Sequence, residues 1–113
     1  MLKKINCLNK DKEFDNVFKN GRVSYDKILG VRAASSKIKN CRFGIIVSNK
    51  ISKKAVERNK IKRRLRDIAG KELEKLKGGF DVIMIALPTI SEGEYQEMKL
   101  SVIGHFKKLR LYK

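Results

Sequence analysis

The sequence contains no tryptophan, one proline, one histidine and two cysteines in 113 residues. Cys7 and Cys41 lack the close spacing of metal-binding cysteine pairs, and although they could form one disulfide, no other feature requires it. No apolar run approaches the roughly 18 residues of a membrane-spanning helix, and the start at Met1 lacks the apolar stretch of a signal peptide. We therefore expect a cytoplasmic protein with free thiols.

Groups that could catalyse a reaction are also scarce. A nuclease made of protein alone needs metal-binding carboxylates or a histidine-based acid–base pair. His105 stands alone late in the chain, where we interpret it as a surface or core-edge residue. Asp11, Glu13 and Asp15 are spaced by two, which turns neighbouring side chains to different sides of a helix. The sequence therefore predicts no catalytic residue and no metal site in this chain.

Positive charge is abundant instead. Lysine and arginine number 28 against 12 acidic residues, which gives a formal net charge of +16. A small domain with this imbalance repels itself unless a polyanion is near, so the charge indicates a nucleic acid or an anionic membrane as partner. The alternative, that the lysines only keep the protein soluble, is disfavoured because the charge is unevenly distributed. The length, with 42% hydrophobic residues, suits one domain spanning residues 1–113.

Hydrophobic spacing predicts a single-domain α+β fold in the order α-β-β-(β)-α-β-α. The predicted helices cover residues 9–19, residues 54–77 and a segment after a capping box at Ser91–Glu94, and the predicted strands cover residues 22–35, 42–48 and 80–87. We expect the first two strands to form a hairpin, and the strands on either side of the central helix to be parallel. General rules would make that crossover right-handed.

Helix ends follow from local sequence. Asn9 is expected to cap the first helix, and Asn20-Gly21 to end it because both residues tolerate a positive φ. Gly70 is expected to weaken or kink the central helix.

The central helix and the residues just before it carry half of the net charge. Nine lysines or arginines and one glutamate lie within residues 50–66. On a helical wheel of about 100° per residue, Ile61, Leu65, Ile68 and Ala69 share one arc and should face the core. Most of the other arc is polar and basic, and consists of Asn59, Lys60, Lys62, Arg63, Arg64 and Arg66.

A two-faced helix does not explain Val56, which lies among the cations, or Arg58, which lies beside the apolar arc. Arginine can bind phosphate oxygens bidentately, and Asn59 could read a base edge or a sugar. A merely solvated face would mix glutamate with lysine, but Glu57 is the only acid here. A membrane-bound helix would need the apolar arc that the core requires. The pattern therefore predicts a basic ridge that binds phosphates.

The same helix resembles the signature of bacterial ribonuclease P proteins, which reads R-N-R-x-K-R-x-x-R and follows a strand ending in G-x-x-V-S-K-K and the pair A-V. The residues that match are Gly44, Val47, Ser48, Lys50, Ala55, Val56, Arg58, Asn59, Lys62, Arg63 and Arg66. Lys60 replaces an arginine, Asn49 stands where the family often has lysine, and the link between strand and helix is one residue longer than usual. The resemblance covers the whole chain.

This resemblance implies three helices, a mixed central sheet of about four strands and a left-handed β-α-β crossover, contrary to the general rule. It also implies that the chain is the protein subunit of ribonuclease P, the ribonucleoprotein endonuclease that removes 5′ leaders from precursor tRNA. The RNA subunit would supply the catalytic groups and use Mg²⁺, with no metal bound stably by the protein alone. The expected partners are the ribonuclease P RNA and the precursor tRNA leader, with no membrane and no DNA.

Two surfaces are expected to contact RNA. The predicted RNA-binding residues of the basic ridge are Lys50, Lys53, Lys54, Arg58, Asn59, Lys60, Lys62, Arg63 and Arg66. Phe14 and Phe18 share a face of the first helix and would by themselves suggest core packing. The resemblance instead implies a cleft that receives the leader, where aromatic faces can stack on bases and Arg32 or Arg42 can contact phosphates.

Two other functions remain as alternatives. The chain could be a non-enzymatic RNA-binding protein, such as a ribosomal protein with a related fold, or a nuclease that acts without a partner.

Overall fold

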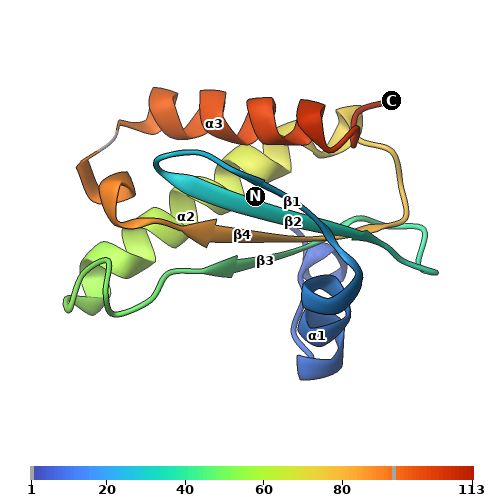
Figure 1. The fold of residues 1–113 in the computed structure, drawn as a ribbon, viewed down its shortest axis with the longest axis horizontal. Coiled ribbons are helices and arrows are strands. Elements are labelled where there is room, and N and C mark those ends of the chain that lie inside the picture. Colours follow the sequence, from blue (N-terminus) through green and yellow to red (C-terminus); the bar gives the residue numbers. More distant parts are fainter. Residues whose placement is uncertain (1, 93) are drawn as a thin grey trace.

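The computed structural model describes residues 2–92 and 94–113 as a mixed β-sheet with helices on both faces (Figure 1). The helices are α1 (Asp11–Asn20), α2 (Ala55–Glu72) and α3 (Tyr95–Lys108), the strands are β1 (Arg22–Tyr25), β2 (Leu29–Ser35), β3 (Arg42–Ile46) and β4 (Phe80–Ala86), and short 3₁₀ helices cover Lys4–Asn6, Leu73–Lys75 and Pro88–Glu92. The α+β class, the three helices and the four-stranded sheet are confirmed. None of the described helices is both long and apolar enough to cross a membrane.

The sheet has the order β1-β2-β4-β3, with β4 antiparallel to β2 and parallel to β3. The predicted hairpin between residues 22–35 and 42–48 is therefore wrong, because β4 lies between them. Val82, Ile83 and Met84 of β4 are fully buried, and a strand that is apolar on both sides is stable only at the centre of a covered sheet. The hairpin in this region joins β1 to β2.

The crossover from β3 to β4 is left-handed. In Figure 1 the chain leaves β3, passes behind the sheet as α2 and returns above β3 as β4, in the same direction. The family resemblance implied this hand, and the general rule for β-α-β units did not.

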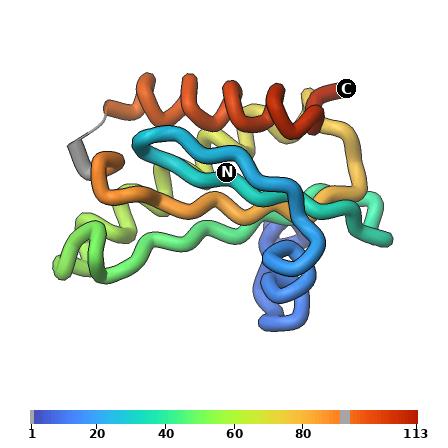
Figure 2. The backbone as a smooth tube through the Cα atoms, in the orientation of Figure 1, coloured from blue at the N-terminus to red at the C-terminus, as the bar shows by residue number. Residues whose placement is uncertain are grey.

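The two faces of the sheet have separate cores. On one face α2 and α3 bury the larger cluster, in which Leu65 and Phe106 pack with Met84. On the other face α1 buries a smaller cluster of Leu8, Val17, Ala34 and Ile83. Figure 2 shows α1 at one end of the sheet, away from α3, so α1 covers only part of its face.

Several predicted helix ends differ from the structure. α1 begins at Asp11 without an Asn9 side-chain cap; instead the Glu13 carboxylate accepts the backbone N–H groups of Asn9 and Lys10, each at 3.1 Å. Gly21 has φ −79°, so the turn after α1 does not use a positive φ. α2 continues through Gly70 to Glu72. α3 begins at Tyr95 with no side-chain cap from Glu94; the predicted capping box includes Gly93, which lies outside the described residues.

A largely buried arginine fastens α1 to the sheet. Arg42 on β3 donates to both carboxylate oxygens of Asp81 on β4, at 2.8 and 2.7 Å, and forms an ion pair with Glu13 on α1. The Arg42 side chain is only 14% exposed. The structure therefore gives Arg42 a role in holding α1 on the sheet, and its expected contact with RNA phosphates stays a prediction.

Glu13 makes the stability of this contact depend on pH. Burial opposes ionisation of Glu13, but hydrogen bonds from the Asn9 and Lys10 backbone and the charge of Arg42 together hold its pKa below the ordinary value of 4.5. A lowered folded-state pKa stabilises the fold above the ordinary value, and the stabilisation disappears as pH falls through the lowered value. We expect Glu13→Gln to cost about 1–3 kcal/mol at neutral pH and to flatten the decline in thermal stability below pH 4.5.

Thermal denaturation from neutral pH downwards measures this effect. Asp15→Asn, which removes an exposed carboxylate from the same helix, is the matched control and should retain the wild-type profile. An equally steep acid decline in Glu13→Gln would show that the ion pair with Arg42 does not govern it.

Candidate RNA-binding surfaces

The outer side of α2 forms the predicted basic ridge. Burial of Ile61, Leu65, Ile68 and Ala69 fixes the inner side of the helix, as predicted. The opposite side is thereby turned to solvent. Of the predicted RNA-binding residues, the exposed ones are Lys50, Lys53, Lys54, Asn59, Lys60, Arg63 and Arg66, and the half-buried ones are Arg58 and Lys62.

The cations of the ridge are not neutralised by the acids of the protein. Within the part of the chain that the structure describes, no ion pair involves a lysine or arginine of residues 50–66. Glu57, the one acid within residues 50–66, instead accepts the hydroxyl of Ser52 at 2.5 Å. The positive potential of the ridge is therefore available to an external polyanion.

The structure explains the two residues that the helical wheel left open. Arg58 lies beside the apolar arc because its guanidinium donates to the Ser52 carbonyl at 2.8 Å and ties the preceding loop to the helix. Val56 is 77% exposed and lines a shallow groove of about 430 Å³ together with Asn59, Arg63 and Arg66. An apolar patch between cations suits a ribose or base whose flanking phosphates meet the arginines.

The second predicted surface lies on the face of the sheet that α1 only partly covers. Phe14 is half-buried against the smaller core, and its ring comes so close to Gly44 on β3 that a side chain there would collide with it. Phe18 is 42% exposed, and the Arg32 guanidinium lies over its ring at 5.3 Å from the centroid. The structure thus brings Phe18 and Arg32 together. Phe14, in contrast, packs partly in the smaller core and is partly exposed at this surface.

Sequence reasoning missed one aromatic of this surface. Tyr25 on β1 is 46% exposed, and its ring packs on Gly30, its partner in β2. Gly30 and Arg32 are two residues apart in one strand, so Tyr25 and Arg32 share a face of the sheet. The only sequence feature that could have indicated Tyr25 is the short strand Arg22–Tyr25. Its four residues are too few to be distinguished from the longer predicted strand, which also includes residues 29–35.

Comparison with known proteins establishes the family of the chain. The family model described as Ribonuclease P matches residues 2–110. The chain belongs to the ribonuclease P protein family. It is 31% identical over 110 residues to the ribonuclease P protein component of Clostridium botulinum, covering 96% of this chain and 98% of the relative. With the component of Bacillus pumilus the identity is 37% over 112 residues, covering 98% and 93%.

Solved structures of ribonuclease P proteins share the fold. The Staphylococcus aureus protein matches with a TM-score of 0.88 at 26% identity, covering 96% of this chain and 98% of that one. The Thermotoga maritima protein matches with a TM-score of 0.81 at 25% identity, covering 90% and 96%. These matches support a ribonuclease P protein in tRNA processing and not the alternative of a ribosomal protein.

His105 of this ribonuclease P protein is buried. The expectation that it lies at the surface or at the edge of the core is therefore wrong. Its Nδ1 forms a hydrogen bond of 2.6 Å with the Ser24 hydroxyl. Its Nε2 lies 3.0 Å from an Asp26 carboxylate oxygen, but the angles of this second contact do not suit a hydrogen bond. Asp26 also accepts the Ser101 hydroxyl and the backbone N–H groups of Ile28 and Leu29. These contacts fasten the β1–β2 turn to α3.

No cluster of three or more histidine, cysteine, aspartate or glutamate residues suited to a metal occurs among residues 2–92 and 94–113.

The salt dependence of RNA affinity tests the basic ridge. We expect Arg63→Ala and Arg66→Ala each to weaken binding of a ribonuclease P RNA. Each should also reduce the slope of log affinity against log salt by about 0.7–0.9 for every phosphate that the variant no longer neutralises. Fluorescence titration at several salt concentrations measures the slope.

Lys107→Ala is the matched control, because it removes the same charge from an exposed position on α3. Equal slopes for all three variants and the wild type would mean that the ridge arginines face only solvent.

Proposed function

We propose that this chain is the protein subunit of a cytoplasmic ribonuclease P in which the RNA subunit, using Mg²⁺, cleaves the 5′ leader from precursor tRNA. The ridge on α2 binds the ribonuclease P RNA, and the surface around Phe18, Tyr25 and Arg32 binds the leader. The observation that carries the proposal is the row of cations on α2 that no acid of the described chain neutralises.

The electrostatics of the ridge supports a role in stabilising folded RNA. Phosphates that approach one another in a compact RNA repel, and a fixed row of lysines and arginines lowers that repulsion by replacing condensed counterions. Less Mg²⁺ is then needed to hold the RNA in its active form. The protein in this proposal supplies binding energy and position, while the RNA supplies the reacting groups and holds the metal.

The sheet surface supports recognition of a single-stranded leader. Phe18 and Tyr25 offer exposed aromatic faces, on which bases stack without regard to their sequence. Arg32 adds a positive charge beside Phe18. Precursor tRNA has a leader and mature tRNA does not, so contacts made here favour the substrate over the product.

Reconstitution tests the proposed function. Purified protein added to a bacterial ribonuclease P RNA should restore cleavage of precursor tRNA at a Mg²⁺ concentration at which the RNA alone is inactive. Cleavage by the protein without RNA would instead support the nuclease that acts alone. Sedimentation with ribosomes without any rescue of cleavage would support a ribosomal role.

The leader surface has its own test. We expect Phe18→Ala and Tyr25→Ala each to weaken binding of precursor tRNA to the reconstituted enzyme by about 1–3 kcal/mol, the usual worth of one stacked base, with little change for mature tRNA. Leu100→Ala, which removes an exposed apolar side chain from α3, is the control. Equally weakened binding of both tRNAs would indicate that these aromatics support the fold and not the leader.

A further inference from the structure

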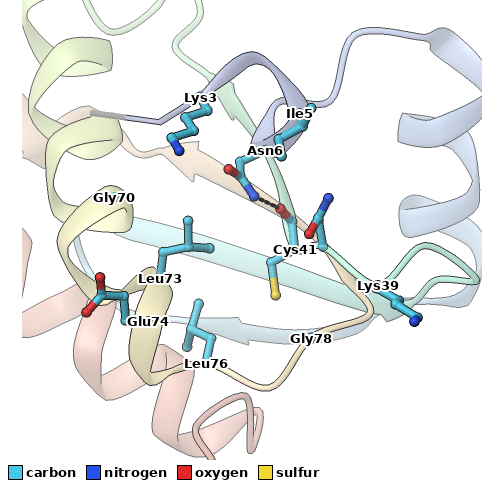
Figure 3. Close-up of a pocket in the computed structure, with 11 residues that line it drawn as sticks. Lys3, Ile5, Asn6, Lys39, Cys41, Gly70, Leu73, Glu74, Leu76 and Gly78 are labelled. Atoms are coloured by element: carbon cyan, nitrogen blue, oxygen red, sulfur yellow. Dashed lines mark hydrogen bonds between the residues drawn. The ribbon is translucent and has the colours of Figure 1, made fainter.

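A second recess lies one turn beyond the ridge, at the end of α2. It has a volume of about 440 Å³, within the range of small-ligand pockets. Its walls come from the N-terminal segment, from the β2–β3 connection and from the end of α2 with the turn that follows. Its lining includes Lys3, Asn6, Lys39, Cys41, Gly70 and Leu73 (Figure 3).

Asn6 lines this recess, and its side-chain amide is hydrogen-bonded on one side only among the described residues. The Asn6 side chain is only 6% exposed, and its amide nitrogen donates to the Cys41 carbonyl at 2.9 Å. That bond fixes the amide, so its oxygen, which accepts no hydrogen bond from a described residue, faces the open space (Figure 3). An acceptor that is open to the recess in this way can receive an N–H group from a ligand.

The rest of the lining suits a flat, partly apolar ligand that carries negative charge. Leu73 and the buried Cys41 offer apolar surface beside the Asn6 amide. Lys3 and Lys39 are exposed cations at its rim and outnumber the one acid of the lining, the exposed Glu74. A nucleotide has these properties together: apolar base faces, N–H groups on the base edge and a phosphate.

The recess continues the stripe of α2 that forms the ridge. Val56, Asn59, Arg63 and Arg66 are spaced by three and four residues, and Gly70 and Leu73 extend the same spacing. Gly70 lies about 6 Å beyond Arg66 along the helix axis, at ~1.5 Å per residue. An RNA strand that follows the ridge arginines would therefore reach the recess next.

Gly70 leaves room for this recess. Glycine is disfavoured in the interior of a helix, yet α2 runs through Gly70 to Glu72. Gly70 belongs to the lining of the recess, to which it contributes only backbone atoms. The glycine thus keeps open a site that a better helix former would narrow.

We propose that this recess holds the base of one unpaired nucleotide of the RNA bound along α2, with the Asn6 amide oxygen accepting an N–H group of the base edge. The proposal rests on the RNA-binding function proposed above. The ridge binds phosphates, whereas the recess would bind a base that has left the stacked RNA.

Nucleotide titration tests the recess without relying on any variant. We expect the four nucleoside 5′-monophosphates, in the millimolar range, to shift the Asn6 side-chain amide and Gly78 backbone signals in NMR spectra, with saturation. Ribose 5-phosphate is the control because it keeps sugar and phosphate but lacks the base. Equal shifts with ribose 5-phosphate would mean that only the lysines bind phosphate, and no saturable shift with any nucleotide would overturn the proposal.

A pair of glycine variants connects the recess to RNA. We expect Gly70→Leu to bind a ribonuclease P RNA about tenfold more weakly, with an unchanged salt slope because the same phosphates are still neutralised. Gly104→Leu is the matched control, since a side chain there meets no atom within 4 Å. Circular dichroism checks that both variants fold, and Gly70→Ala should weaken binding less, in the same direction, if the leucine is not tolerated.

The outcomes separate this inference from the function on which it rests. Wild-type protein that binds no ribonuclease P RNA would refute the proposed function, whatever the nucleotide titration shows. Saturable nucleotide binding, with RNA affinity equal in Gly70→Leu and Gly104→Leu, would identify a site for free nucleotides and overturn the assignment to an RNA strand.

Discussion

Burial of one apolar stripe of α2 is the constraint on which the rest of the molecule depends. The cations of the ridge repel one another and find no acid to pair with in the described chain, so the ridge sequence by itself opposes a stable helix. Packing of Ile61, Leu65 and Ile68 in the larger core supplies the stability that the outer side lacks. Because the core fixes the rotation of the helix, it also fixes the direction of every cation. A ridge ordered in advance loses less entropy when it binds an RNA backbone.

The second surface depends on a charge network in place of a large core. The cluster beneath α1 holds Leu8, Val17, Ala34 and Ile83, far fewer residues than the cluster beneath α2 and α3. Arg42 compensates by joining α1, β3 and β4 through two carboxylates. This bond is directional, so it sets where α1 stands on the sheet. Its position leaves Phe18 beside Arg32 and keeps the rest of that face accessible.

The parts that the sequence predicted are those that local periodicity encodes. The long helix α2 repeats its spacing often enough to distinguish its core side from its ridge, and the apolar run of β4 indicated burial on both faces. The place of β4 between β2 and β3 is a contact between distant segments, which periodicity does not report. Tyr25 was missed because a four-residue strand shows too little alternation, and the open amide of Asn6 depends on a partner 35 residues away.

The hand of the β3–α2–β4 crossover decides whether both surfaces can exist. With the same strand order, a right-handed crossover would place α2 on the opposite face of the sheet, the face of α1. There α2 would lie over β3 and β4 on the face that carries Arg32, and α3 would lack the helix that closes the larger core with it. The left-handed path puts α2 beside α3 and leaves the α1 face open (Figure 1). An unusual chain path thus gives one small domain a convex basic ridge and a separate aromatic surface.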